Sequence, residues 1–333
     1  MNRKRTAGFA AFSVLMVAFL VAAVFPGAVQ AQKIELSIAH QAPPTFVYQI
    51  ISERFKEMLE SKTGGKVTVK IFHSGQLGQE KEYIEGQMIG TADIALVTSG
   101  LLTLWEPLMV YIDLPYLYRD VEHANKVANG PIGEEINKKL EKHGVMVLLC
   151  GDMGFQSLYN RKKPINKPED FAGMKIRVIQ NPLQIDLMNA WGAQAVPMNF
   201  GEVYSALQQG VIDAAANEPY TYDIVKHYEV APYYSITNHL HKMYAMTMSK
   251  KRFDSLPKDV QQAILETAKA LLPVSTQITT EIDLKIIGKL VRENRVLFNT
   301  ADIEAFRKLS QGVLDKWSEK VGKETVEKIK AVK

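Results

Sequence analysis

Arg177 and Asn217 are the two side chains whose type and setting most clearly suggest chemistry. Arg177 lies inside the apolar, strand-like hexapeptide 173–178, and Asn217 directly follows a second apolar run at 211–216. A guanidinium at the edge of a buried sheet needs an anion, because an unpaired buried charge is unfavourable by several kcal/mol. That anion is either a nearby Asp or Glu in a structural ion pair, or a ligand carboxylate held by two parallel hydrogen bonds.

Three further polar side chains follow strand-like segments in the first part of the chain. Gln41 follows the alternating segment 34–38, Glu80 lies in the turn region after 67–71, and Thr98 ends the apolar run 92–97. Ligands of open α/β sheets collect at the carboxyl ends of the strands, which makes all three residues binding candidates. Each also has a structural alternative: Gln41 as a cap, Glu80 in a first helical turn and Thr98 as an N-cap.

The sequence contains none of the common catalytic or cofactor motifs. It has no Gly-x-Ser-x-Gly, His-Glu-x-x-His, Cys-x-x-Cys, Walker or Gly-x-Gly-x-x-Gly pattern. An enzyme hypothesis therefore lacks a nucleophile with its base or a metal cluster, and we expect no catalytic residue, cofactor or metal. Cys150 is the single cysteine, which excludes an intrachain disulfide, and we expect it to be an inert core residue.

Residues 1–31 are predicted to be a cleaved signal peptide. A basic head at Arg3, Lys4 and Arg5 precedes the apolar run 9–25, and Val29-Gln30-Ala31 is a small-residue cleavage site before Gln32. The alternative is an uncleaved anchor, but an apolar run of about 17 residues is at the short limit for spanning a bilayer. No cysteine lies near the cleavage site, which argues against a lipoprotein. We therefore expect a periplasmic protein.

Removal of this leader leaves a nearly neutral protein. The chain has 40 basic and 36 acidic residues, and residues 1–31 hold three of the basic and none of the acidic ones, so the mature net charge is +1. This argues against nucleic acid or a membrane surface as a partner. The remaining chain alternates strand-like and helix-like segments, beginning with a β-α-β unit that predicts a parallel pair. A long helix is expected from 255–257 toward Leu297, with Pro273 inside it, and an amphipathic helix from Ala301 to the end.

The segment 173–219, with its surroundings, resembles the DctP-type solute-binding proteins of TRAP transporters. The resemblance rests on the Gly-Met-Lys-Ile-Arg-Val strand, the Gly-Val-Ile-Asp run before Asn217, and the Leu-Pro-Tyr-Leu-Tyr-Arg-Asp segment at 114–120. It implies that Arg177 grips a substrate carboxylate, that Asn217 is a second ligand contact and that Phe200 forms an aromatic wall. It also implies that the positions of Gln41, Glu80 and Thr98 face the substrate.

One position departs from the family pattern. Many relatives have Gly-Phe-Arg where this chain has Gly154-Phe155-Gln156, and that arginine assists the first one on the carboxylate. The resemblance with Gln156 in this place implies one arginine on the anion, and therefore favours a monocarboxylate or polyhydroxy acid. Tyr220 is a further candidate for the pocket wall. His239 ends a Thr-Asn-His strand that resembles the family's; a lone histidine there is more often structural.

The resemblance implies an α/β, two-lobe periplasmic-binding-protein fold, type II-like, with mixed sheets flanked by helices and a long spine helix across both lobes. We expect lobe I at residues 32–153 and 246–300, lobe II at 154–245, and C-terminal helices at 301–333 packed on the lobes. The implied function is capture of a small organic acid between the lobes and delivery to the membrane subunits of a TRAP transporter, by a monomer. A binding protein for an ABC importer or receptor, or a periplasmic enzyme, remains the alternative.

Overall fold

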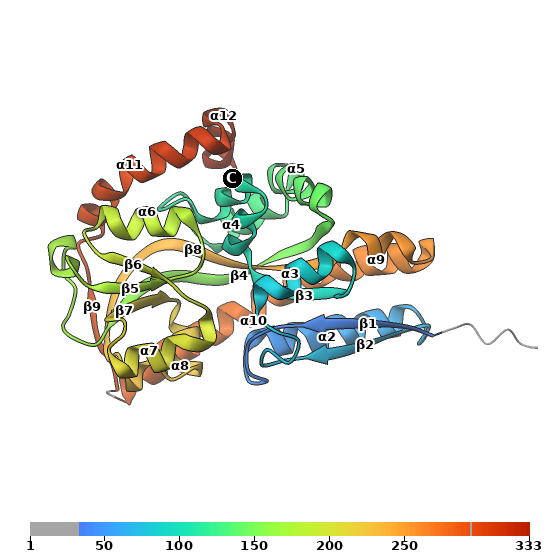
Figure 1. The fold of residues 1–333 in the computed structure, drawn as a ribbon, viewed down its shortest axis with the longest axis horizontal. Coiled ribbons are helices and arrows are strands. Elements are labelled where there is room, and N and C mark those ends of the chain that lie inside the picture. The colour runs from blue at the N-terminus through green and yellow to red at the C-terminus, as the bar shows by residue number, and fades with distance from the viewer. Residues whose placement is uncertain (1–32, 294) are drawn as a thin grey trace, which may run out of the picture.

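The computed structural model describes residues 33–293 and 295–333. Within that part of the chain, nine strands form one continuous sheet in the order β2-β1-β3-β8-β4-β7-β5-β6, with β9 paired to β8. Helices lie on both sides of this sheet, as Figure 1 shows. The α/β class predicted from the sequence is confirmed. The predicted signal peptide, residues 1–31, lies outside the described residues, and no helix inside them is long and apolar enough to cross a membrane.

The strands of the described residues are short except for two. They are β1 (Ile34–Ala39), β2 (Val67–Phe72), β3 (Ile94–Thr98), β4 (Val145–Asn160), β5 (Lys175–Val178), β6 (Gln194–Pro197), β7 (Ala214–Asn217), β8 (Tyr233–Ser249) and β9 (Leu297–Thr300). The α-helices are α2 (Val47–Lys62), α3 (Glu80–Ile89), α4 (Val121–Ala128), α5 (Pro131–Lys138), α6 (Pro182–Ala190), α7 (Val203–Gln209), α8 (Pro219–Ile224), α9 (Lys250–Ser255), α10 (Lys258–Arg292), α11 (Ile303–Val321) and α12 (Lys323–Ala331).

The first half of the chain builds one end of the sheet. β1 pairs in parallel with β2 and with β3, as the alternating and apolar sequence patterns predict. α2 buries Val47, Ile51, Phe55 and Leu59 at helical spacing against this end of the sheet. The carboxyl ends of β1 and β3 consequently lie side by side, which brings the polar residues that follow them to one edge.

Two long strands connect this end of the sheet to the other. β4 and β8 pair antiparallel over most of their length, and the register between them shifts at three places, one of them between Asp152 and Gly154. At one end β8 pairs with β3, and at the other end β4 pairs with β7. The predicted lobe boundaries at 153/154 and 245/246 thus fall inside these two strands. The residue bounds of the two lobes stay a prediction.

The second end of the sheet holds the segment 173–217 that the sequence singled out. β5 pairs in parallel with both β6 and β7, so the end of β5 and the end of β7 lie at the same edge. The turn before β5 requires Gly173, whose φ is +75°. Phe200–Glu202 forms a short 3-10 helix, η5, directly before α7. Arg177 lies in β5, Asn217 is the last residue of β7, and Phe200 lies in η5 after β6, so all three come from this end of the sheet.

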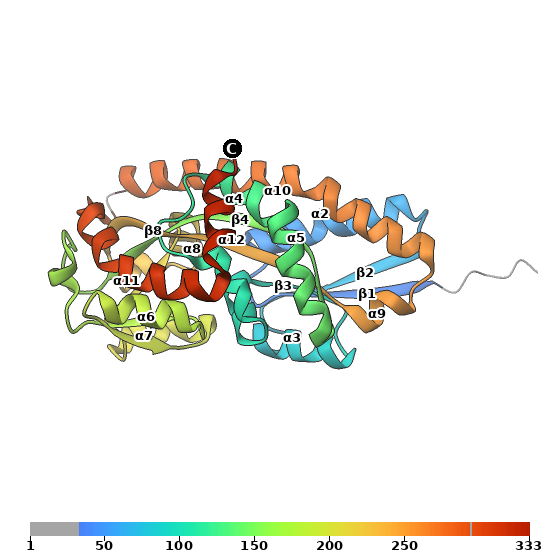
Figure 2. The ribbon, with the colours of Figure 1, turned by 90° about the horizontal axis from the view of Figure 1, so that it is seen from above.

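The long helix α10 runs along one side of the whole molecule, as Figure 2 shows most clearly. It has 35 residues with Pro273 inside, and it ends at Arg292 rather than near Leu297 as predicted. Residues Leu297–Thr300 form the strand β9 on β8 instead. The C-terminal segment, where helices were expected at 301–333, holds two helices, α11 and α12, separated at Gly322. Trp317 and Phe306 of α11 pack into the largest apolar core of the described residues.

Candidate ligand-binding site

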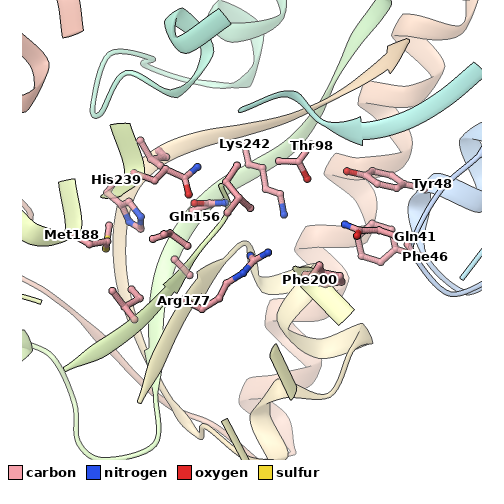
Figure 3. A pocket seen from close by; sticks show the side chains of 17 residues that line it. Gln41, Phe46, Tyr48, Thr98, Gln156, Arg177, Met188, Phe200, His239 and Lys242 are labelled. Atoms are coloured by element: carbon pink, nitrogen blue, oxygen red, sulfur yellow. The ribbon is translucent and has the colours of Figure 1, made fainter. Parts of the chain in front are cut away.

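A polar cavity lies where the carboxyl ends of the two halves of the sheet face each other. It contains about 620 Å³ of space not filled by atoms, part of it open to solvent. Figure 3 shows the side chains around it. The polar side chains in its lining are Gln41, Tyr48, Thr98, Gln156, Arg177, Gln184, His239 and Lys242, and the larger apolar ones include Phe46, Met188 and Phe200.

Arg177 points into this cavity from β5 and is only 7% exposed. Its Nε donates to the backbone carbonyl of Met198 at 3.0 Å, and its guanidinium carbon lies 5.8 Å from the centre of the Phe200 ring. Among the described residues, no carboxylate oxygen lies within ion-pair distance of Arg177. Burial lowers the pKa of this guanidinium, opposed by the negative potential of Tyr159, Glu80 and Glu202. The internal ion pair considered from the sequence is therefore not seen in the described structure.

Glu80 is fully enclosed and accepts hydrogen bonds from Thr98. Its Oε1 accepts from the Thr98 backbone N–H at 2.9 Å and from the Thr98 hydroxyl at 3.2 Å. Burial raises the pKa of Glu80, while the hydrogen bonds from Thr98 and the charges of Lys242 and Arg177 oppose that shift. Glu80 lines a smaller cavity that adjoins the first one and shares Gln41, Arg177 and Phe200 with it. Glu80 is also the first residue of α3, where a carboxylate suits the helix dipole.

His239 occupies the opposite side of the cavity from Gln41 and Phe46 (Figure 3). Its ring is completely buried and stacks edge-on against Trp191 at 5.1 Å. Nδ1 lies 2.9 Å from the Thr237 hydroxyl, whereas Nε2 has no hydrogen-bond partner among the described residues. Burial lowers the pKa of His239 to about 3, so the ring is neutral at physiological pH. It can therefore offer one hydrogen bond to a ligand but no charge.

Asn217 and Tyr220 are not among the side chains that line the cavity. Asn217 is 1% exposed; its amide nitrogen donates to the Tyr159 hydroxyl at 2.9 Å, and its Oδ1 accepts from Lys242 at 3.1 Å. The Tyr220 hydroxyl donates to the Thr45 carbonyl, and its ring packs behind Phe46 at 5.2 Å. Each residue contacts a side chain that lines the cavity, Lys242 for Asn217 and Phe46 for Tyr220. Their direct contact with a ligand stays a prediction.

Lys242 is the site residue that the sequence reasoning missed. The sequence predicted one arginine on the anion, which stays a prediction, but Lys242 adds a second cationic side chain to the lining of the cavity. Its side chain is 11% exposed and lies 3.4 Å from Glu218 Oε2. The available signal was a single lysine within the largely buried strand β8.

The start of α6 adds a second group that was not predicted. Asn181 caps the helix, and its amide also donates to Asp113 at 2.7 Å and to the Gly100 carbonyl at 3.0 Å. Gln184, which lines the cavity, donates to Asp113 at 3.0 Å. Burial raises the pKa of Asp113 to about 6. These contacts tie the start of α6, after β5, to the segments that follow β3.

The comparisons with known proteins agree with this geometry. The chain matches the family described as bacterial extracellular solute-binding protein, family 7, over residues 38–320. It is 30% identical over 308 residues to the C4-dicarboxylate-binding periplasmic protein DctP of Rhodobacter capsulatus, covering 90% of this chain and 91% of that one.

Two solved TRAP periplasmic solute-binding proteins have the same fold. The protein from Pseudomonas putida F1 with bound D-glucuronate has a TM-score of 0.86 and 32% identity, covering 90% of this chain and 98% of that one. The protein from Polaromonas sp. JS666 bound to D-erythronate has a TM-score of 0.86 and 28% identity, covering 90% and 99%.

The chain belongs to the family 7 extracellular solute-binding proteins, the substrate-binding subunits of TRAP transporters. The family predicted from the sequence and the two-lobe α/β fold class are thereby confirmed. Members of this family are periplasmic binding proteins that work with TRAP membrane components, not enzymes. The alternatives of a periplasmic enzyme and of an ABC-importer subunit are therefore set aside.

Proposed function

We propose that this protein binds a monocarboxylic sugar acid or a closely related polyhydroxy acid, with the ligand carboxylate on Arg177. The observation that carries the proposal is the buried guanidinium of Arg177, which points into a cavity and has no carboxylate partner among the described residues. A planar guanidinium binds a carboxylate through two parallel hydrogen bonds, and a buried cation gains most from such a ligand. Phe200, beside the guanidinium, then covers an apolar face of the ligand.

The charges around the cavity favour one carboxylate over two. Arg177 and Lys242 are the cations of the site, and the buried carboxyl groups of Glu80 and Glu218, whose pKa values burial raises, lie near them. A monoanion on Arg177 adds one negative charge to this site, and a dianion adds two. A second carboxylate would approach Glu80, and like charges in a buried site repel strongly.

Hydroxyl groups of the ligand have matching partners in the lining. Gln41, Gln156, Gln184 and the Nε2 of His239 are neutral donors or acceptors, and Glu80 is an acceptor in the adjoining cavity. A site that hydrogen-bonds hydroxyl groups rejects analogues without them, because its own polar groups are then left unpaired. The similar proteins with bound D-glucuronate and D-erythronate carry ligands of this kind.

We also propose that the mature protein begins near Gln32 and acts in the periplasm as a monomer. The basic and apolar pattern of residues 1–31 and the periplasmic location of the family support export by a cleaved leader. The net charge of +1 after cleavage gives no support for a nucleic-acid partner. Intact mass of the secreted protein and its elution volume test these two statements.

A thermal-shift screen of organic acids tests the ligand class. The panel contains D-glucuronate, D-galacturonate, D-erythronate, succinate and acetate, each at the same concentration. A ligand at about 100 times its Kd stabilises the folded state by about 2.7 kcal/mol, which corresponds to a Tm increase of roughly 4 °C for a protein of this size. We expect the sugar acids to produce such a shift and succinate and acetate to produce little. A larger shift with succinate than with every sugar acid would overturn the proposal.

A further inference from the structure

Lys242 is an unusual residue for its place in the fold. It lies in the middle of β8, between the buried residues His241 and Met243, and its own side chain is 11% exposed. Burial of an ammonium group is unfavourable unless its hydrogen bonds are satisfied and its charge is balanced. The contacts of Lys242 therefore indicate what the residue is for.

Two buried groups hold the Lys242 amine. It donates to Asn217 Oδ1 at 3.1 Å, and it lies 3.4 Å from Glu218 Oε2, a carboxylate that is itself fully buried. The second distance is that of a charge pair rather than of a well-formed hydrogen bond, since Glu218 Oε2 counts as unpaired by hydrogen-bond geometry. An ammonium has three N–H donors, so at least one remains for another partner.

The orientation of Asn217 is fixed from behind. Its amide nitrogen donates to the Tyr159 hydroxyl at 2.9 Å, and that hydroxyl lies 2.7 Å from Nδ1 of His227. Burial lowers the pKa of His227 to about 3, so its ring is neutral and Nδ1 can accept the Tyr159 proton. This chain of hydrogen bonds leaves the Asn217 oxygen, not its nitrogen, facing Lys242.

The Lys242 amine and the Arg177 guanidinium point from β8 and β5 toward the same part of the cavity (Figure 3). Two buried cations directed at one space repel each other unless an anion lies between them. Glu80 faces both charges, but its Oε1 is engaged by two hydrogen bonds from Thr98. The shared space therefore suits an anion from outside.

We propose that Lys242 is the second cationic contact of the ligand carboxylate, and that Asn217 acts by positioning the Lys242 amine. This inference rests on the proposed function. Lys242 on β8 would supply the second positive charge that Gln156 on β4 lacks. Gly154 of β4 pairs with Lys242 of β8, two residues before Gln156, so both side chains reach the same cavity. The carboxylate would be held by Arg177 in the plane of its guanidinium and by Lys242 from a second side.

Lys242→Met tests this assignment, with D-glucuronate and D-erythronate as probes in calorimetry. Because Lys242→Met alone leaves the buried Glu218 carboxylate unpaired, the decisive variant is Lys242→Met combined with Glu218→Gln, which removes both charges together. Lys175→Met, at an exposed position on β5, is the matched control for loss of one lysine. We expect the double variant to fold with a cooperative melt and to bind at least about 30-fold more weakly, and the control to match wild type.

The position of Asn217 behind Lys242 makes a separate prediction for a double-mutant cycle. Asn217→Ala should weaken binding in the wild-type background and have little further effect once Lys242 is Met, because a positioning residue acts only through its partner. A full additional loss in that background would show that Asn217 contacts the ligand itself and would overturn its assigned role.

The outcomes separate this inference from the proposed function. If no acid of the panel binds the wild-type protein, the proposed function fails. If the wild type binds D-glucuronate and the folded Lys242→Met, Glu218→Gln variant binds it within about threefold, the role of Lys242 is overturned while the proposed function stands. The variant that combines Arg177→Lys with Lys242→Met gives a further test. If its loss of affinity equals the product of the two single losses, the two residues act independently, Lys242 contacts a different group of the ligand, and the shared-carboxylate geometry is refuted.

Discussion

Replacement of Arg177 by Met separates its role in binding from any role in stability. The ligand-free protein buries this cation with one hydrogen bond, from Nε to the Met198 carbonyl, and one aromatic face, Phe200. A charge-assisted hydrogen bond contributes about 1.5–3 kcal/mol and a partly desolvated cation–π contact about 1–2 kcal/mol. The desolvation penalty of a buried ion is several kcal/mol, so these two contacts do little more than offset it.

We therefore expect opposite signs for the two measurements on Arg177→Met. Methionine keeps much of the apolar volume of the arginine stem and removes the buried charge, so the ligand-free variant should melt no lower than wild type and up to about 5 °C higher. Binding of a sugar acid should fall by roughly 2–5 kcal/mol, which is about 30- to 5,000-fold. Arg177→Lys keeps the charge without the planar fork and should also lose most of the affinity.

Differential scanning calorimetry without ligand and titration calorimetry with D-glucuronate measure the two effects on the same samples. A variant that melts several degrees below wild type would show that Arg177 supports the fold through contacts not accounted for by Met198 and Phe200. Near-wild-type affinity of Arg177→Met would refute the proposed site, because it would show that the guanidinium does not bind the ligand.

Three further predictions follow from the site and the fold. Glu80→Gln should weaken hydroxylated acids more than acetate, whereas an equal loss across the panel would mean that Glu80 acts through the fold. His239, with its pKa lowered to about 3 from the usual 6.5, contributes stability that is present above pH 6.5 and is lost as the pH falls toward 3. His239→Gln should therefore flatten the decline in urea-unfolding free energy between pH 7 and 4.5, by about 3 kcal/mol at the lower pH, and an unchanged slope would contradict this. Small-angle scattering should show compaction with saturating ligand; an unchanged profile would argue against closure of the lobes.

Local sequence patterns predicted most of the helices and short strands correctly. α4 begins after Asp120, which caps it, and α6 begins with Pro182 after the capping residue Asn181; these residue types favour a helix N-terminus. The polar residues after β1 and β3 also lie together, because the pairing of parallel strands sets which ends meet. Such features depend on residues a few positions apart, and a single sequence contains that information.

The errors lie where pairing over long distances decides the structure. β4 extends from the apolar run 145–150 as far as Asn160, because β8 supplies hydrogen-bond partners along most of this length. The long helix was expected to run toward Leu297, yet Leu297–Thr300 forms β9, which pairs with β8. Helical propensity in a short segment is a weak preference, and pairing with an existing sheet edge overrides it.

The role of Lys242 depends on the same kind of long-range information. Gln156 carries no charge where many relatives have an arginine. The residue of β8 that faces this part of β4 decides whether the site has one cation or two. The register between these strands shifts between Asp152 and Gly154 and again between Gln156 and Leu158, and a shift of one residue turns a side chain to the other face of the sheet. Neither shift has a signature in the sequence beyond Gly154, whose φ is +94°. A prediction from motif positions alone compares residues at matching places along the chain, and it therefore cannot detect a cation supplied by a neighbouring strand.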